Sequence, residues 1–205
     1  MRETTTAGDA DAYAVVLVEG LSDRYALEAL ARRHGRDLDA EGIRVLEMKG
    51  ATNIGRFLGR YGPRGLGVRL AGLYDAAEEG CFRRALERAG LGPGDSPAEM
   101  ERLGFFRCSA DLEDELIRAL GTEAVERIIE EQGELRSFRI LQRQPAQRPR
   151  STHDQLHRFL GSRAGRKHRY GRLLAEAVDL TRVPRSLDRV LAHVARCSST
   201  GGHAA

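Results

Sequence analysis

The stretch VVLVEGLSDRYALEALA, residues 15–31, decides the fold. Its four leading aliphatic residues are followed at once by Glu19 and Gly20, a pattern typical of a strand that is buried on both faces and ends in a tight turn. Ser22 is expected to cap a helix over about residues 23–33, where apolar residues recur near the helical period. Strand, turn and helix in this order form the first half of a βαβ unit.

Three further segments have the composition of buried strands, with helical patterns between them. The expected strands are IRVLEMKG (43–50), GVRLAGLYDA (67–76) and FFRCS (105–109), and the expected helices cover residues 54–61, a segment after Asp75, a segment capped by Ser96, and residues 110–121. This alternation predicts an α/β, Rossmann-like fold with a mostly parallel four-stranded sheet flanked by helices.

The pattern changes beyond about residue 133. The segment QRQPAQRPR (142–150) is rich in proline and arginine and is interpreted as a linker or extended crossover, with helices to follow over about 152–160, 170–178 and 187–194. We expect a flexible N-terminus over residues 1–12, the sheet domain over 13–135, a basic and mainly helical C-terminal region over 136–196, and a flexible tail over 197–205.

The net charge of +3 combines two parts of opposite sign. Residues 136–196 carry fifteen Lys or Arg against four Asp or Glu, a balance of +11, which leaves −8 for the rest. A basic segment beside an acidic body suits a protein that binds a polyanion with one part and divalent cations with the other. A helical surface that is merely solvated would show the same excess of basic residues.

Several protein classes are disfavoured. No apolar run approaches the roughly 20 residues of a membrane span, and the first residues lack the pattern of a signal peptide, so a cytoplasmic protein without membrane contact is expected. Cys81, Cys108 and Cys197 are odd in number and far apart, which favours buried free thiols over a zinc site or a disulfide framework.

Acidic residues follow three of the expected strands. They are Glu19 and Asp23 after the first, Asp75, Glu78 and Glu79 after the third, and Asp111, Glu113 and Asp114 after the fourth. Ligands of parallel sheets bind beyond these strand ends. Two carboxylates about 4 Å apart repel by roughly 4 kcal/mol at an effective dielectric near 20, so such a cluster needs a cation, and oxygen ligands favour Mg²⁺.

Most of these acids also have a simpler explanation, because negative charge is favoured in the first turn of a helix. Glu19 and Asp75 do not fit that explanation, since each lies at the end of the strand itself. Their convergence favours a metal site.

Three motifs, VVLVEGLSD, LYDAAEEG and SADLEDEL, resemble in order and spacing the acidic motifs of a TOPRIM domain, most closely that of the overcoming-lysogenization-defect (OLD) nucleases. MKGATNIGRFL is similar to the glycine-bearing segment after their second strand, and GRKHRYGRLLAEAVDLTRVPRSL to their lysine-bearing region. The likeness covers about residues 13–195 and implies a TOPRIM fold over residues 13–135.

The resemblance implies a two-metal nuclease that uses Mg²⁺, for which Mn²⁺ can substitute. Glu19, a ligand or a proton acceptor, and Lys167 would be catalytic, although Lys167 could equally be one more phosphate-contacting or solvated base. The implied metal ligands are Glu19, Asp23, Asp75, Glu79, Asp111 and Glu113. DNA is expected as substrate ahead of RNA, because the basic region holds few aromatic residues for base stacking. The phosphates of the DNA would contact Arg143, Arg148, Arg150, Arg163, Arg166 and Arg169.

Two departures from the family pattern stand out. Ala77 occupies the second position of the usual Asp-x-Asp motif, where Glu78 or Glu79 would have to compensate. The 205 residues contain no GxxxxGK[ST] phosphate loop, so the resemblance implies a free-standing TOPRIM protein whose ATP dependence, if any, comes from a separate ATPase subunit. A homodimer stays open.

Other functions stay open beside the nuclease. A catalytically weak TOPRIM module could bind nucleic acid or a partner ATPase in a regulatory or phage-defence role. A small-molecule enzyme on a related sheet is a third reading, although no glycine-rich fingerprint follows the first strand. The chain lacks room for a topoisomerase tyrosine domain, and nothing resembles the zinc module of a primase.

Overall fold

The computed structural model describes residues 12–195. Apart from Ala12, the expected flexible ends, residues 1–12 and 197–205, lie outside this range, and Cys197 lies outside it with them. Cys81 and Cys108 are free thiols, the first half-buried and the second buried.

The sheet has four parallel strands in the order β2-β1-β3-β4, which confirms the expected α/β fold. The strands are β1 (Ala14–Val18), β2 (Ile43–Glu47), β3 (Arg69–Asp75) and β4 (Phe105–Cys108). Every residue of β1 is buried, as a central strand covered on both faces requires. Because all four strands point the same way, their carboxyl ends, with Glu19 and Asp75, lie along one edge.

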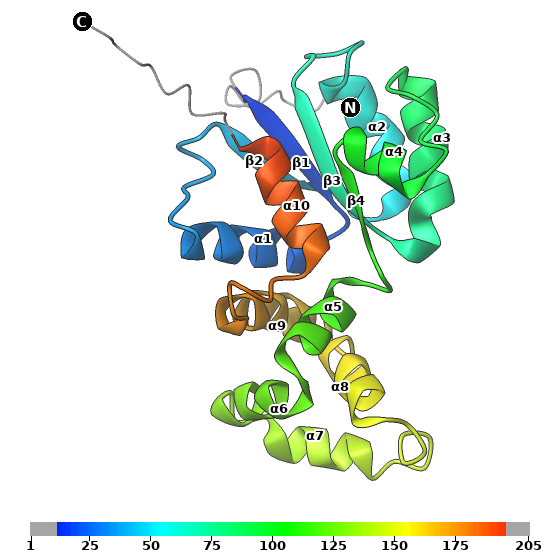
Figure 1. Cartoon of the computed structure of the whole chain (residues 1–205). Coiled ribbons are helices and arrows are strands. Elements are labelled where there is room, and N and C mark those ends of the chain that lie inside the picture. The colour runs from blue at the N-terminus through cyan, green and yellow to red at the C-terminus, as the bar shows by residue number, and fades with distance from the viewer. Residues whose placement is uncertain (1–11, 196–205) are drawn as a thin grey trace, which may run out of the picture.

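Helices cover both faces of this sheet (Figure 1). The two helices on one face are α1 (Leu21–Arg33) and α10 (Arg185–Val194), which pack on Val16 and Leu73. The other face is covered by α2 (Ile54–Tyr61), α3 (Glu79–Ala89) and α4 (Pro97–Arg102), with the short 3₁₀ segments η2 (Ala51–Asn53) and η3 (Ala76–Glu78) before α2 and α3.

Gly72 is required in the sheet. A Cβ there would lie 2.9 Å from the carbonyl oxygen of Leu17 and 2.9 Å from the Phe105 ring, so any side chain would collide with the neighbouring strands.

A second, helical layer lies beyond the carboxyl ends of the strands (Figure 1). It contains α5 (Leu112–Leu120), α6 (Thr122–Glu131), α7 (Leu135–Gln142), α8 (Thr152–Leu160) and α9 (Ala164–Ala177). Its buried residues are continuous with the core on the α1 side of the sheet. Except for Gln142, which ends α7, the segment 142–150 that was interpreted from sequence as a linker lies in a turn-rich loop between α7 and α8.

The chain is divided differently from the expectation. It enters the helical layer at α5, before the expected boundary at residue 135, and α10 returns to pack on β3 and β4. The periodicity of α10 identifies a helix but not the surface against which its apolar side packs. For this reason α10 was assigned from sequence to the helical region over residues 136–196.

The two layers meet most extensively where α9 packs on α1. Gly171 makes this contact possible, because a Cβ there would lie 2.4 Å from Oγ of Ser22. The close approach brings the basic first half of α9 to the turn that carries Glu19.

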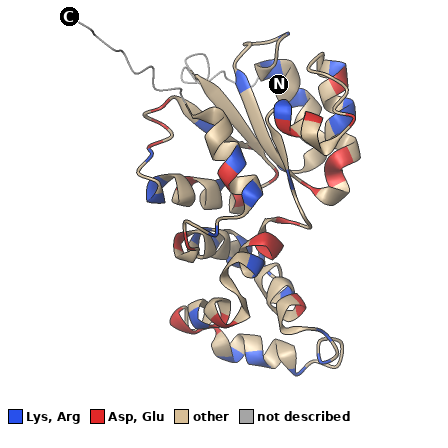
Figure 2. Cartoon of the chain, in the orientation of Figure 1, with Lys and Arg blue, Asp and Glu red and all other residues tan. Residues whose placement is uncertain are grey.

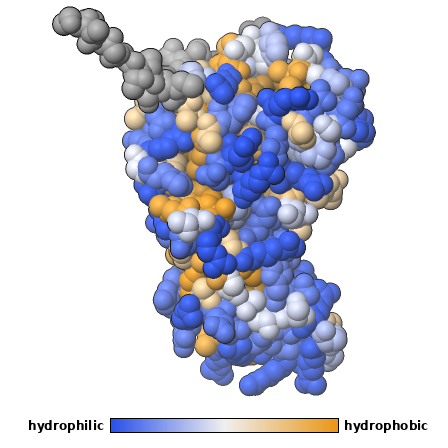
Figure 3. Space-filling view, in the orientation of Figure 1, coloured by the Kyte–Doolittle hydropathy of each residue, from blue (hydrophilic) through white to orange (hydrophobic). Residues whose placement is uncertain are grey.

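The outer surface in the view of Figure 3 is mostly hydrophilic, with small hydrophobic patches. None of the helices within residues 12–195 combines the length and apolar character that a membrane span needs.

Candidate functional site

A small cleft lies at the carboxyl ends of the strands, between the sheet and the helical layer. Its volume is about 170 Å³. The residues that line it come from the β1–α1 turn, the end of β2 and the loop after it, the end of β3, the start of α5, and α9. They are Glu19, Gly20, Leu21, Ser22, Asp23, Glu47, Lys49, Gly50, Asp75, Asp111, Glu113, Lys167 and His168.

The turn after β1 differs from the sequence expectation. The helix begins at Leu21, and Gly20 is its N-cap, with its backbone N–H donating to Oδ2 of Asp23 at 2.9 Å. Ser22 is therefore not the cap. Its hydroxyl instead donates to Oε1 of Glu113 at 2.5 Å, which links the β1–α1 turn to α5.

Glu113 is the most deeply buried acid of the cleft, with 2% exposure. Besides Ser22, its carboxylate contacts Lys167, whose Nζ lies 3.2 Å from Oε2. Burial by itself would lower the pKa of Lys167, but the neighbouring Glu113 and Asp23 raise it, so the ammonium form is stabilised. The cleft therefore contains a positive charge fixed on its most buried carboxylate.

Asp111 is fixed on two sides. It is the N-cap of α5, where its Oδ1 accepts from the backbone N–H of Asp114 at 2.9 Å, and its Oδ2 lies 2.7 Å from Nε2 of His157. Burial opposes ionisation here, but the bonds from His157 and from the Asp114 backbone lower the pKa of Asp111 below its usual value. One turn earlier on α8, His153 contacts Asp114 at 2.7 Å.

Two other carboxyls of the cleft are poorly compensated. Burial, followed by the charge of Glu113, raises the pKa of Asp23 to about 7, and burial together with Glu19, Asp23 and Asp111 raises the pKa of Asp75 to about 7. In the described part of the chain, neither Glu19 nor Asp75 has a side-chain hydrogen bond or ion pair. Lys167 lowers the pKa of both carboxyls, but its effect is smaller than that of burial and of the neighbouring carboxylates, so the negative charge around this space is only partly balanced.

The donor set fits a hard divalent cation, because the cleft is lined by the carboxylate oxygens of Glu19, Asp23, Asp75, Asp111 and Glu113 and, among the described residues, by no cysteine. As they stand, however, no three His, Cys, Asp or Glu side chains within residues 12–195 are placed to hold one ion together. Asp23, Asp111 and Glu113 are turned toward Gly20, His157 and Lys167. Binding would require some of these side chains to rotate away from their present partners.

The loop after β2 supplies a cation that sequence reasoning overlooked. Lys49 lines the cleft and has a φ of 59°, which in the described range makes it the only residue other than glycine with a positive φ. The Asn53 amide holds the loop by donating to the carbonyls of Met48 at 2.9 Å and Lys49 at 3.1 Å. Such strain is typical of functional sites. In the sequence, a lysine followed by a glycine shortly after an expected strand could have indicated this cation at the cleft.

Ser22, Glu47, His157 and His168 were likewise missed. The spacing of His153 and His157 by one helical turn was a signal for a shared face on α8. Nothing local marks Ser22 as the partner of Glu113, because the two residues come from distant parts of the sequence.

Glu79 lies apart from the other predicted metal ligands. It does not line the cleft, and its carboxylate lies 3.5 Å from the guanidinium of Arg107 on β4. Glu79 was expected to return to the face of Asp75 as on one helix, but Asp75 ends β3 and α3 begins only at Glu79, after η3, so the two residues do not share a helix. Glu78 lies outside the cleft lining too.

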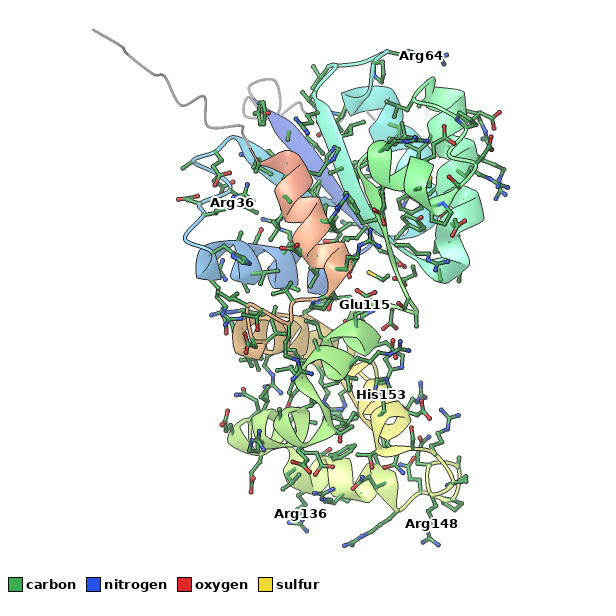
Figure 4. All side chains as sticks on the ribbon, in the orientation of Figure 1. Arg36, Arg64, Glu115, Arg136, Arg148 and His153 are labelled. Atoms are coloured by element: carbon green, nitrogen blue, oxygen red, sulfur yellow. The ribbon has the colours of Figure 1, made fainter. Side chains whose placement is uncertain are left out.

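The predicted phosphate-binding arginines fall into two groups. Arg166 and Arg169 contact Glu134, and the Arg166 guanidinium, 8% exposed, stacks 4.0 Å from the centre of the Phe159 ring. Arg169 is nevertheless exposed, and so are Arg143, Arg148, Arg150 and Arg163, which do not contact Glu134. Figure 2 shows the basic segments along α7 and the following loop, and Figure 4 shows Arg136 and Arg148 pointing outward from the end of the helical layer.

Comparisons with known proteins agree with the fold described above. Residues 12–76 match the family described as overcoming lysogenization defect protein-like, TOPRIM domain. The C-terminal region of the OLD protein of Xanthomonas campestris pv. campestris is similar in structure, with a TM-score of 0.73 and 24% identity over 92% of this chain and 94% of that one. The C-terminal region of the Burkholderia pseudomallei OLD protein has a TM-score of 0.70 and 22% identity over 89% and 97%. No curated protein sequence matches significantly.

Proposed function

Because this chain carries an OLD-like TOPRIM domain, we propose that it is a Mg²⁺-dependent endonuclease that nicks or cuts DNA. One observation carries the proposal: acids from three separate strand ends converge on one cleft, and two of them, Asp23 and Asp75, have pKa values raised to about 7. Perturbed carboxyls gathered in a cleft are typical of a catalytic site.

Glu19 and Asp75 are the first candidates to hold a cation, since their carboxylates have no other partner among residues 12–195. Asp23, Asp111 and Glu113 would complete the ligand sets. A bound divalent ion would activate a water molecule and stabilise the leaving oxygen of a phosphodiester.

The chain's own residues would supply charge and orientation. Lys167, held by Glu113, can donate to a phosphate oxygen as negative charge grows there. Ser22 keeps the Glu113 carboxylate in place. Glu19, exposed at the strand end, can serve as a ligand or as the proton acceptor of the attacking water.

DNA binding would rely on the exposed cations. Arg143, Arg148, Arg150 and Arg163 are free to meet a polyanion, whereas Arg166 and Arg169 already contact Glu134. Lys49 places a further positive charge at the cleft itself.

Cleavage of supercoiled plasmid tests the proposal. The wild-type protein should nick it with Mg²⁺ or Mn²⁺ and not with chelator, and Glu19→Gln should lose at least about a hundredfold in rate. Glu87→Gln removes the same charge from an exposed position of α3 and should cut normally. Equal cutting by Glu19→Gln and wild type would overturn the proposed mechanism.

A catalytically weak module that binds nucleic acid or a separate ATPase is the second candidate. It is favoured by Ala77 in the aspartate motif and by the engagement of Glu79 with Arg107. Inactivity with both metals, together with intact DNA binding, would support this candidate over the nuclease.

A further inference from the structure

A second cavity lies at the outer edge of β4, beside the proposed catalytic cleft. Its volume is about 240 Å³, and it is lined by Tyr74, Pro97, Glu101, Phe106, Arg107, Ser109, Glu115, Arg185, Ser186 and Arg189. Tyr74 immediately precedes Asp75 of the cleft, and Ser109 and Glu115 flank the segment with Asp111 and Glu113. Figure 4 shows Glu115 at the junction of the sheet with the helical layer.

The hydroxyl of Tyr74 is an unexplained polar group in this wall. Tyr74 is 2% exposed, its ring packs 5.1 Å from that of Phe82, and its Oη is buried without a hydrogen-bond partner. A buried hydroxyl that donates to nothing costs roughly 1–3 kcal/mol, whereas phenylalanine would fill the same space at no such cost. A water molecule or a ligand that the protein itself does not supply would satisfy this hydroxyl.

The charges around the cavity favour an anion. Three arginines line it, against Glu101 and Glu115. Glu115 is already satisfied, because it accepts from the backbone N–H of Ser109 and from the hydroxyl of Ser186. Glu101 is shared by Arg185 at 2.9 Å and Arg189 at 3.7 Å, so two guanidinium groups face one carboxylate.

Arg107 has only a weak partner. It lies 3.5 Å from Glu79 in a solvent-exposed pair, and such pairs contribute little to stability. Its guanidinium is therefore available to turn toward a stronger acceptor.

The start of α10 adds a further positive end. Its N-cap is Pro184, which offers no side-chain acceptor, and its first turn holds Arg185 and Ser186 in the cavity wall, whereas the acidic residue of that turn, Asp188, does not line the cavity. The exposed N–H groups of an uncapped first turn attract anions. In Figure 3, which views the molecule with α10 in front, this face is largely hydrophilic.

We propose that this cavity binds one phosphate group of the DNA strand whose neighbouring phosphodiester lies in the cleft. Tyr74, Arg107, Arg185 and Arg189 would donate to its oxygens. The site itself follows from the cavity, and only the identity of its ligand as DNA rests on the proposed function. It would fix the register of the strand at the cleft, because a second held phosphate leaves the backbone little freedom to slide.

Tyr74→Phe gives the sharpest test, because it removes only an oxygen that has no partner in the protein. Binding of a labelled DNA duplex is measured by fluorescence anisotropy in chelator, so that the result does not depend on cleavage. We expect Tyr74→Phe to bind roughly three- to tenfold more weakly with an unchanged or higher melting temperature. Arg185→Ala combined with Arg189→Ala should weaken binding further and reduce the salt dependence, log Kd against log salt, by about one phosphate contact. Arg88→Ala, at the far end of α3, is the matched control and should bind as wild type does.

The outcomes separate the site from the nuclease proposal. Unchanged DNA affinity, salt dependence and binding of inorganic phosphate in both cavity variants would overturn the site, whatever their cleavage activity. Titration with inorganic phosphate distinguishes the source of the ligand. If Tyr74→Phe loses binding of inorganic phosphate while its DNA affinity stays at the wild-type value, the assignment to DNA is wrong.

Discussion

The Nζ of Lys167 on α9 lies 3.2 Å from Oε2 of Glu113 on α5, and both residues line the acidic cleft. The lysine thus provides positive charge where other carboxyls of the cleft lack a counterion. Its removal would leave a nearly fully buried carboxylate without its cation.

Lys167→Met should reduce plasmid cleavage by about 10²- to 10³-fold, because the charge growing on the phosphate loses its donor. Lys167→Arg keeps the charge and should recover part of the rate. Single-turnover cleavage at saturating protein measures both. Wild-type rates in Lys167→Met would show that this lysine only balances Glu113.

Gly171→Ala should destabilise the protein by roughly 1–3 kcal/mol, since the new methyl group would lie 2.4 Å from Oγ of Ser22 and force α9 away from α1. Gly165→Ala is the control on the same helix: its Cβ meets nothing within 4 Å, and a gain of about 0.5–1 kcal/mol is expected. Urea unfolding measures both. Similar stabilities for the two variants would contradict the close packing at Ser22.

The metal-free protein should lose stability as pH rises from about 4 to about 7. In this window folded Asp75 and Asp23, with pKa values near 7, keep protons that the unfolded chain has released. Each pH unit costs at most roughly 1.4 kcal/mol per group. Asp75→Asn should weaken the dependence, and Mg²⁺ should stabilise the wild type more at pH 8 than at pH 5. Thermal melts across this range test it, and a pH-independent Tm would refute the charge cluster.

Glu134→Gln should destabilise the helical layer by roughly 1–3 kcal/mol. Although partial burial opposes its ionisation, hydrogen bonds from Arg166 and Tyr170 lower the pKa of Glu134, and Arg166 is itself buried. Glu126→Gln removes a surface partner of Arg139 and should cost less than about 1 kcal/mol. Chemical denaturation distinguishes them, and equal small losses would mean that the Glu134 pairs contribute little.

Lys49→Gly and Lys49→Ala separate charge from backbone strain. Both lose the cation at the cleft and should cut DNA more slowly. Glycine tolerates a φ of 59° whereas alanine does not, so Lys49→Gly should be more stable than Lys49→Ala by about 1 kcal/mol. Paired melting curves and cleavage rates check this, and a less stable glycine variant would argue against strain in the loop.

The elements that depend on local pattern could be predicted from sequence. The run of buried aliphatic residues before Glu19 identified the central strand, and the strand end at Asp75 was placed correctly. The cap of α4 at Ser96 was predicted because its hydroxyl accepts from the backbone N–H of Glu99, three residues away. Strand burial and helix caps are set by residues a few positions apart, so the sequence alone contains them.

Contacts between distant residues were decided only by the tertiary structure. Ser22 was expected to cap α1, but its hydroxyl donates to Glu113. Glu79 was expected beside Asp75 but contacts Arg107, and Arg166 was expected to contact DNA but packs on Phe159. Sequence determined that acids occupy the strand ends, because each position follows from a local periodicity. Which of them meet, and which basic groups remain free for a polyanion, depends on how α9 packs on α1, a contact between surfaces that no single segment encodes.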